Sequence, residues 1–445
     1  MADPIPAAAS DGAPARRSGP LLTIFTTVFI DLLGFGILIP VFPLLISPGS
    51  PFRVTPAGWS FTTGLIMLGW LQAVYPFFTF LAAPVLGQLS DRFGRRPVLA
   101  LSIAGTSLGY VLFALGIVSK NLPLLFAARA LDGLTGGNIA VAQAAVGDIS
   151  NDTNRAKNFG IIGAAFGIGF IIGPYLGGRL SAPHTSFYHL FTTPGWFGAT
   201  TPFWFAAILA AVNCGLVLWR FPETIHQKDP HRKLHLGKSF TNVMHGFASP
   251  RLRVPLLSAF LFNAGFTFFT SYFGVYLRNR FAFTQSSTGD YFAIVGLFIA
   301  ISQGAIVGLV AKKLADYKVL RFSYFGLSAA LCMYFAATSK LPLYLTIPVF
   351  TAFNGLTMAN TTTLISRSAE PGRQGEAMGI YSSVQNLAQV PASALVGYIT
   401  GSVSSNTPLV VSASCIFAAG LAFVALFRPT YVSQSSARPA MAAAH

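Results

Sequence analysis

The chain has 445 residues, of which 53% are hydrophobic and only 9% are charged, and its mean hydropathy is +0.61. Soluble domains carry about 25% charged residues, so this composition excludes a soluble globular protein and predicts a polytopic membrane domain. The net charge of +16 does not indicate nucleic-acid binding, because the basic residues are spread over short loops and form no single basic face.

Twelve apolar runs are long enough to cross a bilayer, for which a helix needs about 20 residues. They cover residues 20–46, 61–86, 97–118, 121–147, 157–181, 202–221, 252–277, 289–311, 319–338, 341–366, 375–400 and 407–428. An even number of spans places both termini on the same side of the membrane. We therefore expect an all-α integral membrane protein with twelve transmembrane helices.

Lysine and arginine are distributed unequally between the two sides. Connections on the side of the amino terminus hold Arg16, Arg17, Arg92, Arg95, Arg96, Arg155, Lys157, the 220–253 segment, Lys312, Lys313, Lys318, Arg321, Arg367, Arg373 and Arg428. The opposite side holds only Arg53, Lys120, Arg179, Arg278, Arg280 and Lys340. Cytoplasmic loops carry the positive excess, so both termini should be cytoplasmic. The short loops and the lack of processing signals predict a multi-pass protein of the inner (plasma) membrane.

The spans divide the chain into five segments. These are a disordered cytoplasmic tail at 1–19, a first six-helix bundle at 20–221, a cytoplasmic linker at 222–250, a second six-helix bundle at 251–428 and a cytoplasmic tail at 429–445. The first segment is not interpreted as a signal peptide, because the apolar run that follows it is too long and carries Asp31.

Cysteine and histidine give no indication of a metal site or a cofactor. The cysteines, Cys214, Cys332 and Cys415, all fall in apolar runs and lack metal-ligand spacing. The linker holds His226, His231, His235 and His245, but no acid or cysteine completes a convincing ligand set. We interpret the linker as a solvated basic segment.

The loop Gly87–Pro97 holds one acid and three arginines between two apolar runs. Its charges must lie at the membrane surface, because burying them unpaired in hydrocarbon is too costly. Its pattern, Gly-x-Leu-Ser-Asp-Arg-x-Gly-Arg-Arg, resembles the signature loop between helices 2 and 3 of the major facilitator superfamily. The resemblance implies a cytoplasmic gate that latches the two halves; a static topology anchor is the alternative. The gate would comprise Gly87, Asp91, Arg92, Gly94, Arg95, Arg96 and Asp148, with Asp148 as a partner for Arg95.

The same resemblance implies two pseudo-symmetric six-helix bundles with the substrate cavity between them near the midplane. Two echoes in the sequence agree with such a repeat. Gly87…Asp91 is echoed by Gly308…Asp316, and Gly173-Pro174 by Val390-Pro391, both at an offset of about 220 residues.

The first span carries an acid, Asp31, near mid-membrane. The segment from Asp31 to Pro43 resembles the Asp…Gly-x-Gly…Pro-x-x-Pro pattern of twelve-span drug:proton antiporters, including tetracycline exporters. Desolvation disfavours the charged form of a carboxyl group and a nearby cation favours it, so such an acid can be tuned to bind and release protons. We interpret Asp31 as a site for a proton or a cationic substrate. The alternative is a structural partner for polar groups on neighbouring helices.

The fourth span places Arg129 and Asp132 three residues apart on one helix face, where they can partly neutralise each other. The pattern from Arg129 to Gly133 resembles the proton-linked arginine motif of the family, which implies proton coupling by Asp31, Arg129 and Asp132. A structural ion pair is the alternative.

The fifth span is rich in glycine. Its segment Gly169-x-x-x-Gly173-Pro174-x-x-Gly177-Gly178 resembles the antiporter motif associated with export. Small residues at this spacing allow close helix contact, and proline bends a helix. Helix packing alone is the alternative reading of the same residues.

Polar and aromatic residues in other spans are candidates for the walls of a substrate cavity. They are Gln72, Tyr75, Asn138, Gln143, Asn263, Phe266, Gln303, Asn354, Asn360, Gln385, Asn386 and Gln389.

The sequence therefore predicts a secondary transporter, not an enzyme, that exports small amphipathic compounds in exchange for protons and works as a monomer. No P-loop is present to use ATP. Gly109 precedes Tyr110 where the tetracycline-exporter branch has an acid, and the ninth span lacks an acid, which argues against tetracycline itself. The main alternative is proton-coupled or facilitated uptake of a sugar, organic acid or other metabolite by the same fold. A receptor or a membrane-embedded enzyme is a more distant one.

Overall fold

The computed structural model describes residues 19–150, 155–187, 191–225, 235, 237–370, 373–402 and 406–429. The two expected tails, from residue 1 to 18 and from 430 to 445, lie outside the described residues, as do His226 and His231 of the linker.

The first half of the chain is a bundle of helices with one small hairpin. Its helices are α1 (Gly19–Ile46), α2 (Phe61–Phe93), α3 (Arg95–Val118), α4 (Leu122–Thr135), α5 (Asn138–Asp148), α6 (Arg155–Leu180) and α7 (Thr201–Arg220). Strands β1 (Ser186–Phe187) and β2 (Phe191–Thr192) pair antiparallel between α6 and α7.

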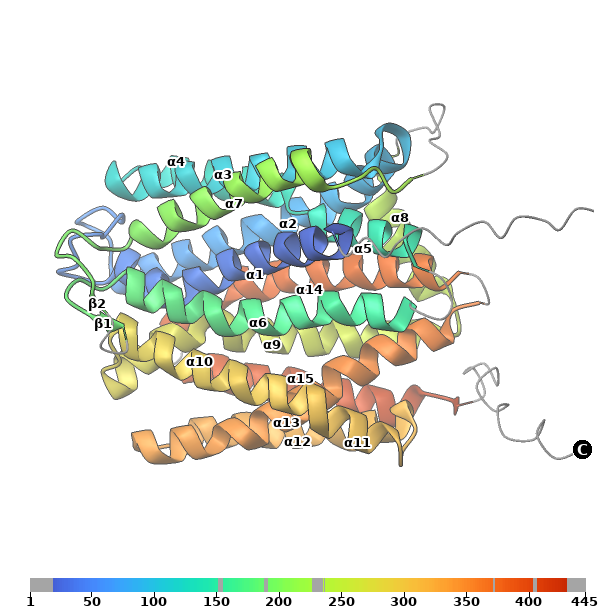
Figure 1. Cartoon of the computed structure of the whole chain (residues 1–445). Coiled ribbons are helices and arrows are strands. Elements are labelled where there is room, and N and C mark those ends of the chain that lie inside the picture. The colour runs from blue at the N-terminus through green and yellow to red at the C-terminus, as the bar shows by residue number, and fades with distance from the viewer. Residues whose placement is uncertain are drawn as a thin grey trace, which may run out of the picture.

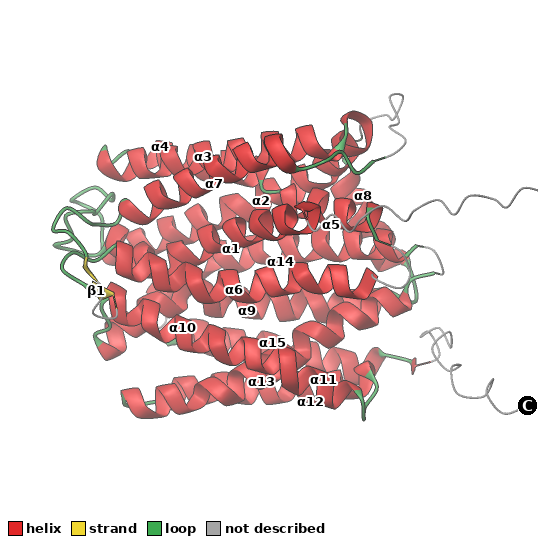
Figure 2. Cartoon of the chain, in the orientation of Figure 1, coloured by secondary structure: helices red, strands yellow, loops and turns green. Residues whose placement is uncertain are grey.

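The second half is also a helical bundle. The linker helix α8 (Lys238–Ala248) precedes it. Its own helices are α9 (Arg253–Phe281), α10 (Gln285–Ile301), the π-helix Ser302–Ile306, α11 (Val307–Ala311), α12 (Asp316–Ala336), α13 (Lys340–Ser368), α14 (Gln374–Ser402) and α15 (Thr407–Leu426). The long helices of both halves run along one common direction (Figures 1 and 2). The pair β1–β2 marks one end of the bundle, here called the strand end, and α8 lies at the opposite end, here called the linker end (Figure 1).

The predicted all-α membrane fold is confirmed. Nine helices in the described part of the chain are long and apolar enough to cross a membrane. The other three predicted runs coincide with α4 and α5 together, with α6 and with α14. The run at 121–147 was expected to be one helix, but Gly136 and Gly137 separate α4 from α5. Glycine disfavours a helix interior because it loses the most conformational freedom there.

The linker is more ordered than a solvated segment. Residues 238–248 form α8, whose Ser239 is fully buried and donates a hydrogen bond to the backbone oxygen of Phe80 in α2. The ring of Phe240 packs edge-on against Phe80, with centroids 5.1 Å apart. Gly246 packs against Ile380 of α14. The expectation of a fully solvated linker is therefore wrong for this part, since α8 contacts helices of both halves.

The two halves come into backbone contact near the strand end. A Cβ atom added to Gly289 of α10 would lie 2.8 Å from the backbone oxygen of Pro174 in α6. A Cβ atom added to Gly69 of α2 would lie 2.6 Å from the backbone oxygen of Ser393 in α14. Glycine is required at such contacts because any side chain would push the helices apart.

Candidate functional site

A cavity lies between the two halves, bounded by α1, α2, α4, α9 and α14. Its α1 wall is apolar, with Leu38, Ile39, Phe42 and Pro43. Polar groups come from Gln72 and Tyr75 of α2 and from Ser271 of α9, among others. Among the described residues that line this cavity, Arg129 carries the only charge. An apolar wall with a few polar groups is the usual make-up of a small-molecule site.

Arg129 is held by an acid on its own helix and by an aromatic ring on α2. Its Nη1 donates to Oδ2 of Asp132 at 3.0 Å, and both residues are 6% exposed. Its guanidinium lies over the ring of Tyr75, 4.6 Å from the centroid. The ion pair predicted from the three-residue spacing is confirmed. Its Nε is buried and has no hydrogen-bond partner among the described residues.

Asp31 lies close to this pair but outside the cavity lining. Asn138 and Asp132 are the polar neighbours of its carboxyl group. Its Oδ2 is buried and accepts no hydrogen bond from the described part of the chain. The hydroxyl group of Tyr110 packs directly against Gly34, one turn along α1. An acid inside a membrane span with a buried oxygen that lacks a hydrogen-bond partner is costly, which points to a functional role.

The glycine-rich face of α6 packs on α1 and α10. A Cβ atom on Gly173 would lie 2.8 Å from the backbone oxygen of Leu33, and one on Gly177 would lie 2.8 Å from the Cα of Ile37. Gly169 faces Leu32 of α1 in the same way, Pro174 contacts Gly36, and Gly178 packs against Gly289. The motif thus brings α6 against the helix that carries Asp31 and against the second half of the chain.

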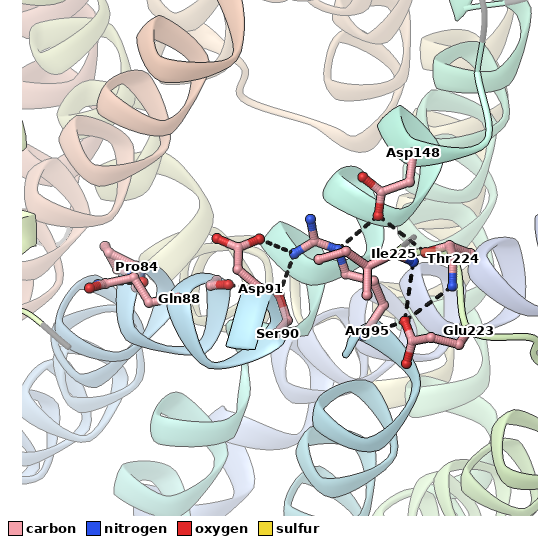
Figure 3. Close-up of polar contacts among 10 residues, drawn as sticks. Pro84, Gln88, Ser90, Asp91, Arg95, Asp148, Glu223, Thr224 and Ile225 are labelled. Atoms are coloured by element: carbon pink, nitrogen blue, oxygen red, sulfur yellow. Dashed lines mark hydrogen bonds and ion pairs between the residues drawn. The ribbon is translucent and has the colours of Figure 1, made fainter. Parts of the chain in front are cut away.

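The segment Gly87–Pro97 was expected to be a loop, but α2 continues to Phe93 and α3 begins at Arg95, so only Gly94 lies between the two helices. The segment is organised around Arg95, which is 7% exposed (Figure 3). Its guanidinium donates to Asp91 Oδ1 at 2.6 Å, to Ser90 Oγ at 2.6 Å and to Asp148 Oδ2 at 2.9 Å. The predicted partnership of Arg95 with Asp148 is confirmed. Gly94 has a φ of 110° and allows the chain to turn from α2 into α3.

Glu223, at the start of the linker, completes this cluster and was not predicted. Its Oε1 accepts the backbone N–H of Arg95 at 2.7 Å, together with those of Thr224 and Ile225 (Figure 3). It therefore caps the first turn of α3, whose own N-cap residue, Gly94, has no side chain that could do so. Among the described residues, the partners of Arg95 all belong to residues 90–223. In this structure Arg95 therefore does not join the two halves, as a latch between them was expected to do, but connects parts of the first half with the start of the linker.

Other members of the predicted gate have different neighbours. Arg96 donates to the backbone oxygen of Leu218 instead of to an acid, and Arg92 lies over the ring of Phe93 at 5.2 Å. A Cβ atom on Gly87 would meet open space.

The second half carries a counterpart of the Arg95–Asp148 pair with reversed charges. Asp316, at the start of α12, accepts a hydrogen bond from Arg367 Nη1 near the end of α13, at 2.9 Å. Arg95 starts α3 and Asp148 ends α5, so the two pairs occupy equivalent places about 220 residues apart. The sequence echo pointed to Asp316 but not to its partner.

The predicted wall residues are only partly found at the cavity. Gln72, Tyr75 and Gln389 line it, and Asn138 lies beside Asp31 instead. The other candidates are described residues that do not line it: Gln143, Asn263, Phe266, Gln303, Asn354, Asn360, Gln385 and Asn386. The polar lining residues that the sequence analysis missed all carry small hydroxyl groups: Thr267, Thr270, Ser271 and Ser393. Threonine and serine are too common in membrane helices to be singled out from one sequence.

A second unpredicted feature joins the halves at the strand end. Arg179 of α6 donates to both carboxylate oxygens of Asp290 in α10, at 2.7 and 2.8 Å. It also donates to the backbone oxygen of Ser186 in β1 and lies over the ring of Tyr175. The only feature of the sequence that pointed to this ion pair was an acid, Asp290, near the start of the eighth predicted span.

Comparison with known proteins identifies the family. The family model described as Major Facilitator Superfamily matches residues 24–393 and 281–444. The chain is 29% identical over 398 residues to the tetracycline resistance protein, class B, of Escherichia coli, covering 88% of this chain and 90% of that protein. It is 27% identical over 427 residues to major facilitator superfamily domain-containing protein 10 of Bos taurus, covering 87% and 88%.

Solved structures show the same fold. The human organic anion transporter MFSD10 superposes with a TM-score of 0.69 at 20% identity, covering 92% of this chain and all of that one. A D-xylose-proton symporter superposes with a TM-score of 0.72 at 15% identity, covering 92% and 98%. The chain is thus a multi-pass membrane transporter that belongs to the major facilitator superfamily.

Proposed function

We propose that this protein exports small amphipathic compounds in exchange for protons, by alternating access of the central cavity. One observation carries the proposal. Asp31, an acid with a buried oxygen that has no hydrogen-bond partner among the described residues, lies next to the Arg129–Asp132 pair, and Arg129 lines a cavity between the two halves. Protonation and substrate binding at adjacent positions can influence each other, because charges interact strongly over short distances in a medium of low dielectric constant.

Asp31 is the proton carrier in this proposal, with Arg129 and Asp132 as the groups that sense it. Asp132 already has a cation as its partner, whereas Oδ2 of Asp31 has none. The loop Gly87–Pro97 gates the cytoplasmic side, which is the linker end, and the close contacts of α6 with α1 and α10 seal the opposite side. Both termini are cytoplasmic, in the inner (plasma) membrane, and the monomer is the working unit.

Two points support export. The tetracycline resistance proteins are relatives over most of the chain, and the glycine motif on α6 is present in full. Tetracycline itself is not the proposed substrate. A Cβ atom on Gly109 would already lie 3.2 Å from the Cβ of Asp132, so the acid of the tetracycline branch would crowd the buried pair.

Proton release triggered by substrate from acid-loaded inverted vesicles tests the proposal. A panel of anionic, neutral, zwitterionic and cationic compounds should contain at least one that collapses the proton gradient. Asp31→Asn should abolish that response at an unchanged protein level. Glu370→Gln, which removes an exposed acid at the linker end, should leave it intact and serves as the matched control.

Uptake of a polar metabolite is the second candidate, since a D-xylose-proton symporter has the same fold. Proton flow in the same direction as the substrate would establish it. A folded protein that gives no response in inverted vesicles but accumulates a solute in right-side-out vesicles would overturn export.

A further inference from the structure

We propose that the central cavity selects amphipathic compounds that carry an anionic group, such as a carboxylate, and that Arg129 binds this group. The inference rests on the proposed function for the claim that the cavity holds the transported compound. It adds the chemical class of that compound and the residue that recognises it.

The charge of the cavity is the first argument. Arg129 is its only charged residue in the described part of the chain, and Asp31, Asp132 and the other acids do not line it. A cationic drug would therefore meet a guanidinium and no carboxylate. An anion would meet the side chain that forms bidentate bonds to carboxylates most readily.

The position of Asp132 is the second argument. Arg129 lines two cavities, the central one and a smaller one inside the first half that is bordered by Gly109, Tyr110 and Phe203. Asp132 lines only the smaller cavity. The guanidinium thus separates its own counter-ion from the substrate side and leaves cationic surface toward the central cavity.

The unused donors of Arg129 are the third argument. A guanidinium has five N–H donors, and the buried Nε donates to no described atom, while Nη1 is taken by Asp132. Leaving a buried charged donor unsatisfied is costly, and a carboxylate from the substrate would relieve that cost. Tyr75, stacked on the guanidinium, fixes its plane.

The rest of the cavity suits an apolar body. Leu38, Ile39 and Phe42 form one wall on α1, and Val275 of α9 contributes to the other side. The cavity of this structure has an accessible volume of about 30 Å³, so a flat aromatic or aliphatic group enters it only when the two halves move apart. Placed there, the group would hold a carboxylate toward Arg129. This arrangement favours organic anions over sugars, which need many polar partners on all sides.

Binding to the purified full-length protein in detergent tests the inference without any gradient. The probes are 2-naphthoate, 2-naphthamide and 2-naphthylmethylammonium, which share one apolar body and differ in charge. Titration calorimetry should give a Kd for naphthoate at least about tenfold below that of the amide and of the ammonium compound, as expected for a hydrogen bond to a charged group.

Variants separate recognition from folding. Asp132→Asn removes the internal carboxylate that competes for Arg129, so naphthoate should bind more tightly than to the wild type. Arg129→Gln with Asp132→Asn leaves no uncompensated buried charge and should bind the three probes about equally. Arg220→Gln, which changes an arginine stacked on Trp219 away from the cavity, should leave all three Kd values unchanged.

Equal affinity for the three probes, or no binding of naphthoate to folded wild-type protein, would overturn the inference. So would weaker naphthoate binding to Asp132→Asn, because Asp132 would then be supporting the ligand site and not competing with it. Failure of the proposed function has a different signature. Naphthoate would bind selectively, yet it would not trigger proton release in vesicles.

Discussion

The two halves of this transporter bury different chemistry. In the first half, Asp31 lies twelve residues from the start of α1, and Arg129 and Asp132 lie at least seven residues from either end of the stretch that α4 and α5 form together. Arg129 and Asp132 are each 6% exposed. In helices α9 to α15 of the second half, every Asp, Glu, Lys and Arg lies within six residues of a helix end. The interior of the second half is instead filled by aromatic rings such as Phe269, Phe273 and Tyr334, whose centroids are 4.4 to 5.8 Å apart.

In the proposed mechanism, this difference gives the two halves separate roles. Charges inside a membrane are costly, and in the proposed mechanism the half that contains them carries the proton and the ion-recognising group. The second half supplies hydroxyl groups to the cavity and has a packed aromatic interior that need not change protonation. The following changes test how far that division extends, from the largest expected effect to the smallest.

Removing Arg129 should have the largest effect. Arg129→Ala leaves Asp132 buried without its partner, and breaking such a pair costs about 3–5 kcal/mol of unfolding free energy. Denaturant unfolding in mixed micelles would measure the loss. The double variant Arg129→Ala/Asp132→Ala should recover most of it. Equal destabilisation of the single and double variants would show that packing, and not charge, dominates at this position.

Truncating Phe273 should destabilise the second half without affecting proton coupling. The side chain is fully buried among aromatic rings, so Phe273→Ala should lower the unfolding free energy by about 3 kcal/mol through lost van der Waals contacts. The ratio of protons to substrate, measured in vesicles on the folded fraction, should remain that of the wild type. A changed ratio would show that the second half also takes part in proton coupling.

The Arg179–Asp290 pair is the place where charge crosses between the halves. Asp290→Asn should shift the protein toward the state open at the strand end by about 1 kcal/mol, or roughly fivefold, because the acid is partly exposed. Maleimide labelling of a cysteine placed at Gln285, which contacts Gly178, would report that opening. The swapped variant Arg179→Asp/Asp290→Arg should restore the slow labelling. If it does not, the pair only anchors the β1–β2 hairpin.

The sequence predicted those features that depend on local spacing or on chain topology. Run length and hydropathy predicted the helices, the spacing of Arg129 and Asp132 predicted their pairing, and the order of the spans brought Arg95 to Asp148. Contacts between distant helices could not be predicted in this way. Most of these helices are apolar on all sides, so the sequence does not reveal which face Ser271 or Ser393 presents to the cavity. The Arg179–Asp290 pair likewise depends on how α6 and α10 meet.

Reversing the charges of the Asp316–Arg367 pair should have the smallest effect and would sharpen the comparison most. If this pair has the same role as the Arg95–Asp148 pair, the two residues need opposite charges, but it does not matter which of them is the acid and which the base. Asp316→Arg/Arg367→Asp, which gives the second half the polarity of the first, should then transport at close to the wild-type rate. Each single change places like charges together and should reduce transport, more for Asp316→Arg, because Asp316 is 6% exposed and the Arg367 side chain is 47% exposed.

A double variant as impaired as Asp316→Arg would mean that the acid itself is needed at the first turn of α12, where it also stabilises the helix N-terminus. The two halves would then share a position for an ion pair but not its role.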